Sequence, residues 1–169
     1  VRLEFIVPAR GLIGFRSQFL TMTSGSGIMT HIFDHYGPVT TAVLAARQNG
    51  VLVSMVTGKS LAYALHALQE RGRLFLDPNI QVYEGQIVGL HSRGNDLVVN
   101  PTKAKQLTNV RASGTDEALT LSPPVKHSLE QALEFIEEDE LVEVTPESIR
   151  LRKKWLLEHE RKRASRSAA

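Results

Sequence analysis

The sequence predicts an α+β protein in two parts, and three observations support this. Short runs of apolar residues alternate with polar ones, as in strands, whereas other apolar residues recur at helical spacing. Closely spaced Gly, Pro and Asn residues divide the middle of the chain, which indicates a small, mostly antiparallel sheet with helices. The 169 residues, 42% of them hydrophobic, suffice for two small domains, which we place at residues 1–47 and 48–169.

The first part is expected to have the order strand, helix, strand. Alternation over residues 1–7 predicts a strand, and Pro8 suits the first position of a helix. Apolar residues then recur near helical spacing until the Gly-rich stretch 24–27 ends a single helix. With a second strand over residues 28–36, the pattern gives half of a ferredoxin-like split βαβ sandwich.

Half of such a sandwich leaves a sheet edge and a helix face bare. The chain also begins in a strand pattern without an initiator Met, which we interpret as a fragment. We therefore expect a companion segment of the same polypeptide, or self-association through residues 1–47, to cover this surface. Gly11 and Gly14 each lower helix propensity by about 1 kcal/mol, and tight packing on the sheet is the favoured explanation.

The second part begins with a buried strand over residues 51–56. Gly58-Lys59-Ser60 follows, and apolar residues at helical spacing predict a helix over residues 61–68. This order imitates a phosphate-binding loop, but Val53 stands where that motif requires Gly. We therefore expect Ser60 to be the helix N-cap and Lys59 a surface cation, with no nucleotide hydrolysis by this segment.

Short strands separated by turns are expected after this helix. Their ranges are 74–76, 81–83, 86–91 and 97–99, followed by a return to the sheet at 118–121 and two last strands at 141–144 and 149–151. A capping box of Ser128 and Gln131 predicts an acidic helix between the return at 118–121 and the last two strands. Its apolar face would contain Leu129, Ala132, Leu133 and Ile136, and its acids are expected to be solvated.

Charge is distributed unevenly along the C-terminal third. Seven acids and no Lys or Arg lie within residues 128–143, whereas residues 146–169 carry eight bases against three acids. A helix from about Lys154 is interpreted as a basic arm suited to nucleic acid or to an acidic partner surface. Lys153, Lys154 and Arg161 are its candidate RNA contacts, and a solvated tail is the alternative.

The stretch 107–117, preceded by Lys103 and Lys105, has almost nothing apolar to bury after Val110. Its cations suit phosphates, and its Asn, Ser and Thr side chains suit sugar and phosphate oxygens. Polyanion binding fits this composition best, and a solvated surface loop is the alternative.

The sequence gives little sign of a disulfide, a metal site or a catalytic triad. The lack of cysteine excludes disulfides, thiolate catalysis and cysteine-based zinc sites. His31 and His35 would share one face of a strand, but no third ligand accompanies them, and no hydrolase triad is suggested. No run approaches the roughly 20 apolar residues of a membrane span and no signal peptide is evident, so we expect a cytoplasmic protein without membrane contact.

Five stretches carry a resemblance to a known family. They are residues 9–16, 47–50, 82–93, 107–117 and the acidic run 137–144. Together they resemble the C-terminal part of the bacterial translational GTPases of the BipA (TypA) family, over essentially the whole chain. The resemblance implies that residues 1–47 are the second half of a domain similar to domain V of elongation factor G. It also implies that residues 48–169 are the C-terminal domain peculiar to the family.

The resemblance implies a function as well. Proteins of this family bind the ribosome in the A-site region, where their C-terminal domain contacts large-subunit rRNA and the acceptor arm of A-site tRNA. They are linked to large-subunit assembly and stress adaptation. The residues that match the RNA-contacting loop are Asn100, Lys103, Lys105, Thr108, Asn109, Arg111 and Ser113. Family members often have a Gly followed by paired lysines here, so either Lys103 or Lys105 is a candidate for the phosphate contact.

By the same resemblance, GTP and magnesium would bind to a domain upstream of this sequence. The chain itself is then expected to be noncatalytic and to hold no cofactor or metal. A free-standing RNA-binding or ribosome-assembly protein is the first rival interpretation, which an open reading frame without upstream GTPase motifs would favour. An enzyme is the second rival, which specific GTP hydrolysis by these 169 residues would support.

Overall fold

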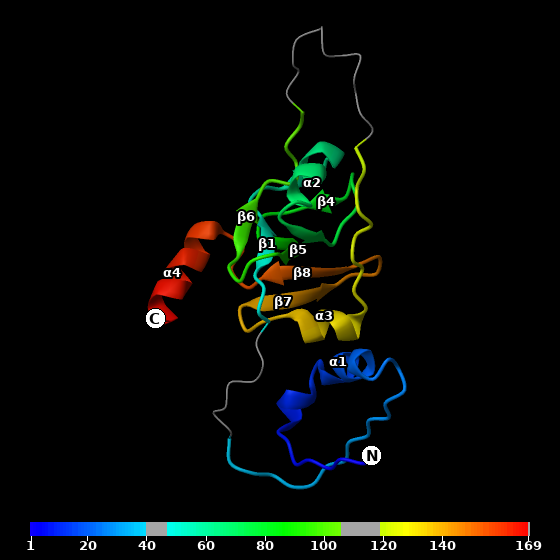
Figure 1. Ribbon diagram of the computed structural model, residues 1–169. Helices are drawn as coiled ribbons and strands as arrows, with labels where there is room; N and C mark the ends of the chain where they lie inside the picture. Colours follow the sequence, from blue (N-terminus) through cyan, green and yellow to red (C-terminus); the bar gives the residue numbers. More distant parts are fainter. Residues whose placement is uncertain (40–46, 106–118, 169) are drawn as a thin grey trace. The chain divides into compact units, whose positions relative to one another are not determined.

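The fold is α+β, as the sequence predicts, and the computed structural model describes residues 1–39, 47–105 and 119–168 of it. The chain divides into two compact units, an N-terminal unit (Val1–Ala46) and a C-terminal unit (Arg47–Ala169). Within the described residues, every strand belongs to the C-terminal unit (Figure 1).

Two short helical segments make up the regular structure of the N-terminal unit, η1 (Ala9–Leu12) and α1 (Phe15–Met22). Gly14 separates them with a φ of 82°, a left-handed conformation that costs little only for glycine, so the single helix expected there is broken. The Gly-rich stretch does end α1 as predicted, because Gly25 adopts a φ of 79° and its N–H donates to the Leu20 carbonyl at 2.7 Å.

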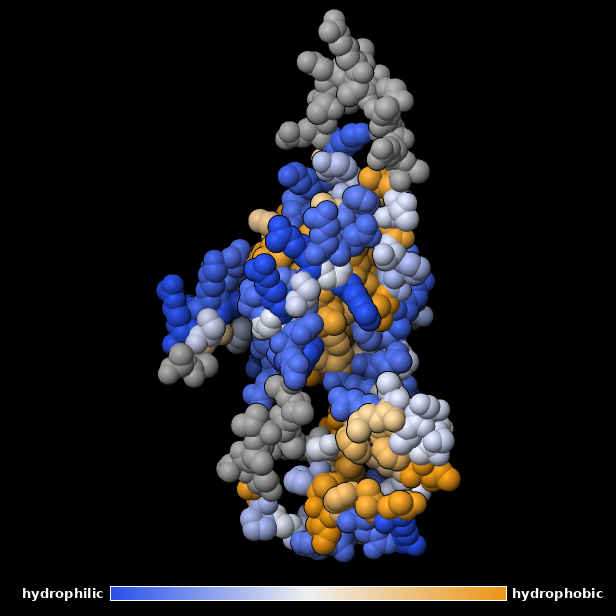
Figure 2. All heavy atoms as spheres, viewed as in Figure 1, coloured by the Kyte–Doolittle hydropathy of each residue, from blue (hydrophilic) through white to orange (hydrophobic). Residues whose placement is uncertain are grey.

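The two strands predicted in the N-terminal unit are wrong for the residues that the structure describes. A strand needs a neighbour for its backbone groups, and segments 1–7 and 28–36 have none here. Their apolar side chains consequently face outward, and Figure 2 shows hydrophobic surface gathered on this unit. At least 70% of each of the following residues is exposed: Leu3, Phe5, Ile6, Ile28, Ile32 and Phe33. Coverage of this surface by a companion segment or a second copy stays a prediction.

The C-terminal unit is built on a six-stranded sheet with the order β6-β1-β5-β8-β7, in which β3 also pairs with β5. Its strands are β1 (Val51–Ser54), β3 (Gly72–Leu74), β5 (Gln86–His91), β6 (Leu97–Val99), β7 (Glu140–Val144) and β8 (Ile149–Lys153). Two further strands, β2 (Gly58–Lys59) and β4 (Gln81–Val82), form a separate ribbon. Only β1 and β6 pair in parallel among these, so the prediction of a mostly antiparallel sheet is confirmed.

Two hydrophobic cores lie on opposite faces of this sheet. Successive side chains of a strand point to opposite faces, so Leu52 joins one core while Val51 and Val53 join the other. Helix α2 (Ala62–Leu68) covers the first core through Leu65, and helix α3 (Leu129–Phe135) covers the second through Ala132. Burial on both faces explains why the first three residues of β1 are all apolar.

The N-cap predicted for α3 is confirmed, whereas the one predicted for α2 is wrong. Ser128 and Gln131 form the predicted capping box of α3. Ser60 is not the N-cap of α2, a position taken by Leu61. Instead Ser60 is buried, donates to the Asp77 carbonyl at 2.9 Å and accepts from the Ile80 N–H at 3.0 Å. The Ser60 hydroxyl group, which the sequence would assign to a helix cap, thus makes hydrogen bonds to distant residues instead.

Other boundaries and faces differ from the prediction. The last helix, α4 (Glu158–Ala168), begins four residues later than expected because β8 continues to Lys153 to pair with β7. No strand forms at residues 119–121, the described part of the predicted return strand. On α3, Leu129 and Leu133 are 42% and 50% exposed, because the helix packs through Ala132 and Phe135 instead.

Replacing Gly85 with Ala is expected to lower the free energy of unfolding of the C-terminal unit by about 2–4 kcal/mol. Gly85 has a φ of 84°, and an added Cβ would lie 2.6 Å from Leu156 Cα, a backbone atom that cannot rotate away. Urea denaturation followed by circular dichroism measures the loss. Gly94→Ala is the matched control, since its Cβ would meet only the Gln48 carbonyl at 3.1 Å. Equal losses in both variants would contradict this explanation.

Candidate nucleic-acid interface

The first side of the candidate RNA-contacting stretch is fixed to the fold by backbone contacts. β6 ends at Val99, and the Asn100 side chain then accepts hydrogen bonds at 2.9 Å from both the N–H and the hydroxyl of Thr102. The buried Pro101 accepts from the Leu61 N–H at 3.0 Å, directly before α2. Because this turn is pinned, Lys103 leaves the fold at a defined point, with its side chain exposed.

The second side is held by the other end of α2. Gln69, which follows the last turn of the helix, donates to the Thr120 carbonyl and accepts from the Ser122 N–H, both at 3.1 Å. The Val125 N–H donates to the carbonyl of Leu74 in β3 at 2.8 Å. We call the two sides, residues 100–105 and 119–125, the loop base. Helix α2 thus contacts both sides of the loop base (Figure 1).

The structure brings three of the predicted contacts together at the loop base. Asn100, Lys103 and Lys105 all lie in the six residues after β6: the half-buried Asn100 uses its side-chain oxygen to shape the turn, and the two lysines are exposed after it. The other four, Thr108, Asn109, Arg111 and Ser113, lie outside the described residues. Their role in RNA binding stays a prediction.

The cations of the basic arm do not all face solvent, although the charge count suggests that they would. Lys153 is only 2% exposed, and its ammonium group contacts carboxylates of Asp96, Asp139 and Glu140 at 2.6, 2.8 and 2.9 Å. Its charge is therefore neutralised inside the fold, and we leave it out of the proposed RNA contacts. Arg161 turns back to donate to the carbonyls of Trp155 and Leu156. Lys154 remains exposed, as do three cations of α4: Lys162, Arg163 and Arg166.

A buried charge cluster occupies the sheet edge near the start of the C-terminal unit. Arg47 and Glu140 form a bidentate ion pair, with nitrogen to oxygen distances of 2.9 and 2.8 Å, and Lys153 contacts the same carboxylate. Arg47 also donates to the Phe135 carbonyl at 2.9 Å and lies over that ring, 4.4 Å from its centroid. The cluster therefore ties three distant stretches of the chain together. Because Glu140 is 2% exposed, the expectation that acids of this run are solvated is wrong for this one.

Each buried charge in this cluster is stabilised by its partners. Burial by itself would raise the pKa of Glu140, but hydrogen bonds from Arg47 and Lys153 outweigh it and hold the pKa below its usual range. Burial by itself would lower the pKa of Lys153, but its hydrogen bonds to Asp139, Asp96 and Glu140 raise it above its usual range. Glu140 and Lys153 are thus both charged at neutral pH.

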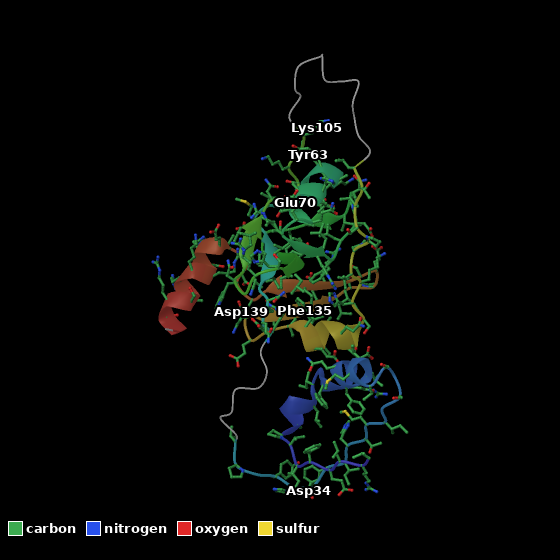
Figure 3. The ribbon with its side chains drawn as sticks, in the orientation of Figure 1. Asp34, Tyr63, Glu70, Lys105, Phe135 and Asp139 are labelled. Atoms are coloured by element: carbon green, nitrogen blue, oxygen red, sulfur yellow. The ribbon has the colours of Figure 1, made fainter. Side chains whose placement is uncertain are left out.

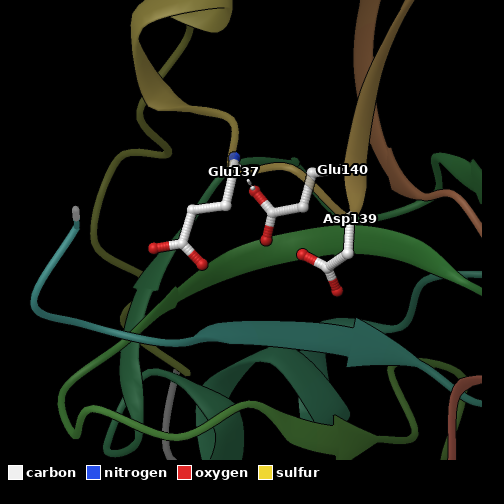
Figure 4. Close-up of side chains that lie close together, drawn as sticks. All are labelled: Glu137, Asp139 and Glu140. Atoms are coloured by element: carbon white, nitrogen blue, oxygen red, sulfur yellow. Dashed lines mark hydrogen bonds between the residues drawn. The ribbon is translucent and has the colours of Figure 1, made fainter. Parts of the chain in front are cut away.

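Three carboxylates of the cluster could in principle surround a metal ion. Figure 4 shows the side chains of Glu137, Asp139 and Glu140 gathered together. Each offers an oxygen atom, and these atoms lie within 4.8 Å of one another. The ammonium group of Lys153 and the guanidinium of Arg47 already lie among them, the latter 3.6 Å from Glu137. The protein supplies its own cations, so the chemistry of this donor set fits an ion-pair cluster instead of a metal site. No other such group occurs in the part of the chain that the structure describes.

Comparison with known proteins places the two units in context. Residues 49–158 match the TypA/BipA C-terminal domain, and residues 1–47 match the elongation factor G C-terminus. The chain belongs to the TypA/BipA family. Similar relatives of the family are each named large ribosomal subunit assembly factor BipA. The relative from Haemophilus influenzae is 62% identical over 99% of this chain, that from Salmonella typhimurium 60% over 98%, and that from Escherichia coli K12 59% over 99%.

The chain spans only 27% of the length of the H. influenzae and S. typhimurium BipA proteins and 28% of the E. coli one. It therefore corresponds to the C-terminal region of a BipA protein, which both domain matches also indicate. None of the helices in the described residues is long and apolar enough to cross a membrane.

Proposed function

We propose that this chain is the RNA-contacting region of a BipA-type translational GTPase that acts in assembly of the large ribosomal subunit. The observation that supports this most is the match of about 60% identity, over nearly all of the chain, to proteins named as assembly factors of that subunit. The proposed contacts are large-subunit rRNA and the acceptor arm of A-site tRNA. GTP and magnesium would bind outside these residues, so no catalysis is assigned to this chain.

The geometry of the loop base supports this role. Both sides of the loop base are hydrogen-bonded to the fold at or beside α2, so the loop base is a fixed part of the surface. Lys103 and Lys105 are exposed on the first side, where phosphates could reach them. We propose that Thr108, Asn109, Arg111 and Ser113 extend this contact, while Lys154 and the exposed cations of α4 make a second, weaker one.

Two rival functions are less well supported. A free-standing RNA-binding protein does not explain the match of residues 1–47 to the C-terminus of elongation factor G. A nucleotide-hydrolysing enzyme would need a phosphate-binding loop at Gly58-Lys59, yet these residues form strand β2 and pair with β4. Lys59 is an exposed surface cation there, as predicted.

Binding to isolated ribosomal subunits tests the proposal. The fluorescently labelled chain is titrated with purified large and small subunits, with and without a minihelix that mimics a tRNA acceptor arm. We expect tighter binding to the large subunit, and an affinity that falls linearly on a logarithmic scale as salt is raised. Equal affinity for both subunits would contradict the assignment to the large one. An unchanged affinity on adding the minihelix would remove the tRNA contact alone.

A further inference from the structure

Helix α2 exposes one aromatic side chain where it contacts the first side of the loop base. Its buried face contains Ala64 and Leu65, and its exposed face contains Tyr63 and Ala67, which are four residues apart. Glu70 is exposed two residues after the helix ends. Tyr63 is 40% exposed, and within the described residues its hydroxyl group makes no hydrogen bond. This ring is therefore not explained by the core or by a polar contact of the described fold.

The position of Tyr63 next to the loop base follows from a backbone hydrogen bond. Leu61, two residues before Tyr63, donates its N–H to Pro101, two residues before Lys103. In the view of Figure 3, Tyr63 and Lys105 lie at the same end of the C-terminal unit, with Glu70, which follows α2, further from Lys105. The ring thus lies close to the point where the exposed lysines begin.

We propose that Tyr63 stacks on an unpaired base of RNA bound at the loop base. This inference rests on the proposed function and names the kind of RNA that the interface takes, an unpaired nucleotide instead of a continuous duplex. Sequence-tolerant recognition of single-stranded RNA combines cations that track the phosphates with aromatic rings on which bases stack. The loop base offers both kinds of side chain within one surface.

Charge along α2 sets the direction in which the RNA lies. Lys59 is exposed just before the helix, and the neighbouring Gly58 lies against Thr102 of the loop base, next to Lys103. Glu70 is exposed just beyond the opposite end of α2 and repels phosphates there. The phosphates therefore follow Lys59 and Lys103. This leaves a base free to cover Tyr63 and the small Ala67.

The occupant is RNA and not an apolar protein surface. One aromatic residue beside an alanine and a glutamate is too small and too polar for the anchored core of a protein interface. Exposed lysines at the first side of the loop base complement phosphates instead. An unpaired nucleotide supplies both the flat base and the negative charge that this surface fits.

The test measures binding of the full chain to two fluorescein-labelled probes, a 12-nucleotide single-stranded RNA and a blunt RNA duplex of equal length. Tyr63→Ala should weaken single-strand binding about 5-fold to 100-fold, while duplex affinity and the slope of log K against log salt stay unchanged. Tyr63→Phe keeps the ring and should bind like the parent chain. Glu70→Gln should tighten binding of the single strand.

Two controls separate this inference from a folding defect and from the proposed function. The thermal unfolding midpoint of Tyr63→Ala should match the parent, and Tyr36→Ala, which removes another exposed ring, should leave RNA binding unchanged. Equal weakening of single strand and duplex, or parent-like binding by Tyr63→Ala, would overturn the stacking role while RNA binding itself stands. Failure of the parent chain to bind either probe would overturn both.

Discussion

Replacing Glu140 with Ala is expected to lower the free energy of unfolding of the C-terminal unit by about 3–5 kcal/mol, because it leaves two buried cations without their shared partner. Arg47 would lose both nitrogen to oxygen contacts with this carboxylate, and Lys153 would lose its contact at 2.9 Å. Asp139 and Asp96 still face Lys153, so the greater part of the loss falls on Arg47.

Urea denaturation of the parent chain and three variants measures this effect. Glu140→Gln keeps the size of the side chain while removing its charge. Its free energy of unfolding should lie between those of the parent and Glu140→Ala. Glu138→Ala removes an exposed acid two residues away and should change stability by no more than about 0.5 kcal/mol. If Glu140→Ala cost no more than Glu138→Ala, the cluster would contribute nothing to folding.

The pH dependence identifies charge as the cause. Since the folded pKa of Glu140 is lowered, its stabilisation is fully present above the unfolded value of about 4.3 and is lost as pH falls below that value. The difference in stability between the parent and Glu140→Ala should therefore shrink in acid. A difference that stays constant down to low pH would indicate lost packing instead of a lost ion pair.

Elements specified by local signals were predictable from the sequence. β5 and β6 have the predicted bounds, because turn residues flank an apolar run in each case. The capping box of α3 was likewise visible, since both partners lie within four residues. These elements also sit in the sheet that supports the loop base, so the support of the candidate site could be anticipated.

Features that depend on distant residues were not predictable. Arg47 and Glu140 are 93 residues apart, and nothing in their local sequence indicates that they pair. Lys153 looked like one more cation of a basic arm, although its register opposite Glu140 in the β7–β8 pair explains its burial. The anchoring of the loop base by Gln69 also joins residues more than 50 positions apart. Such contacts require the three-dimensional arrangement.

Replacing Lys103, Lys105 and Arg111 together by Ala is expected to weaken binding to the large subunit with little change in the thermal unfolding midpoint. Exposed charges contribute about 0–1 kcal/mol to folding but much more to phosphate affinity. Each phosphate contact contributes about −0.7 to −0.9 to the slope of log K against log salt, so the slope should flatten by roughly 2–3 units if all three residues touch phosphate.

Two further triple variants make the measurement specific. The first variant replaces three exposed cations outside the loop base by Ala, namely Arg73, Arg93 and Lys126. It removes the same charge as the loop variant. If net charge alone drove association, this control would flatten the slope as much as the loop variant. Replacement of Lys162, Arg163 and Arg166 examines α4 in the same way. An intact slope in the loop variant with a flattened one in the α4 variant would show that the basic helix carries the binding and that the loop is only solvated.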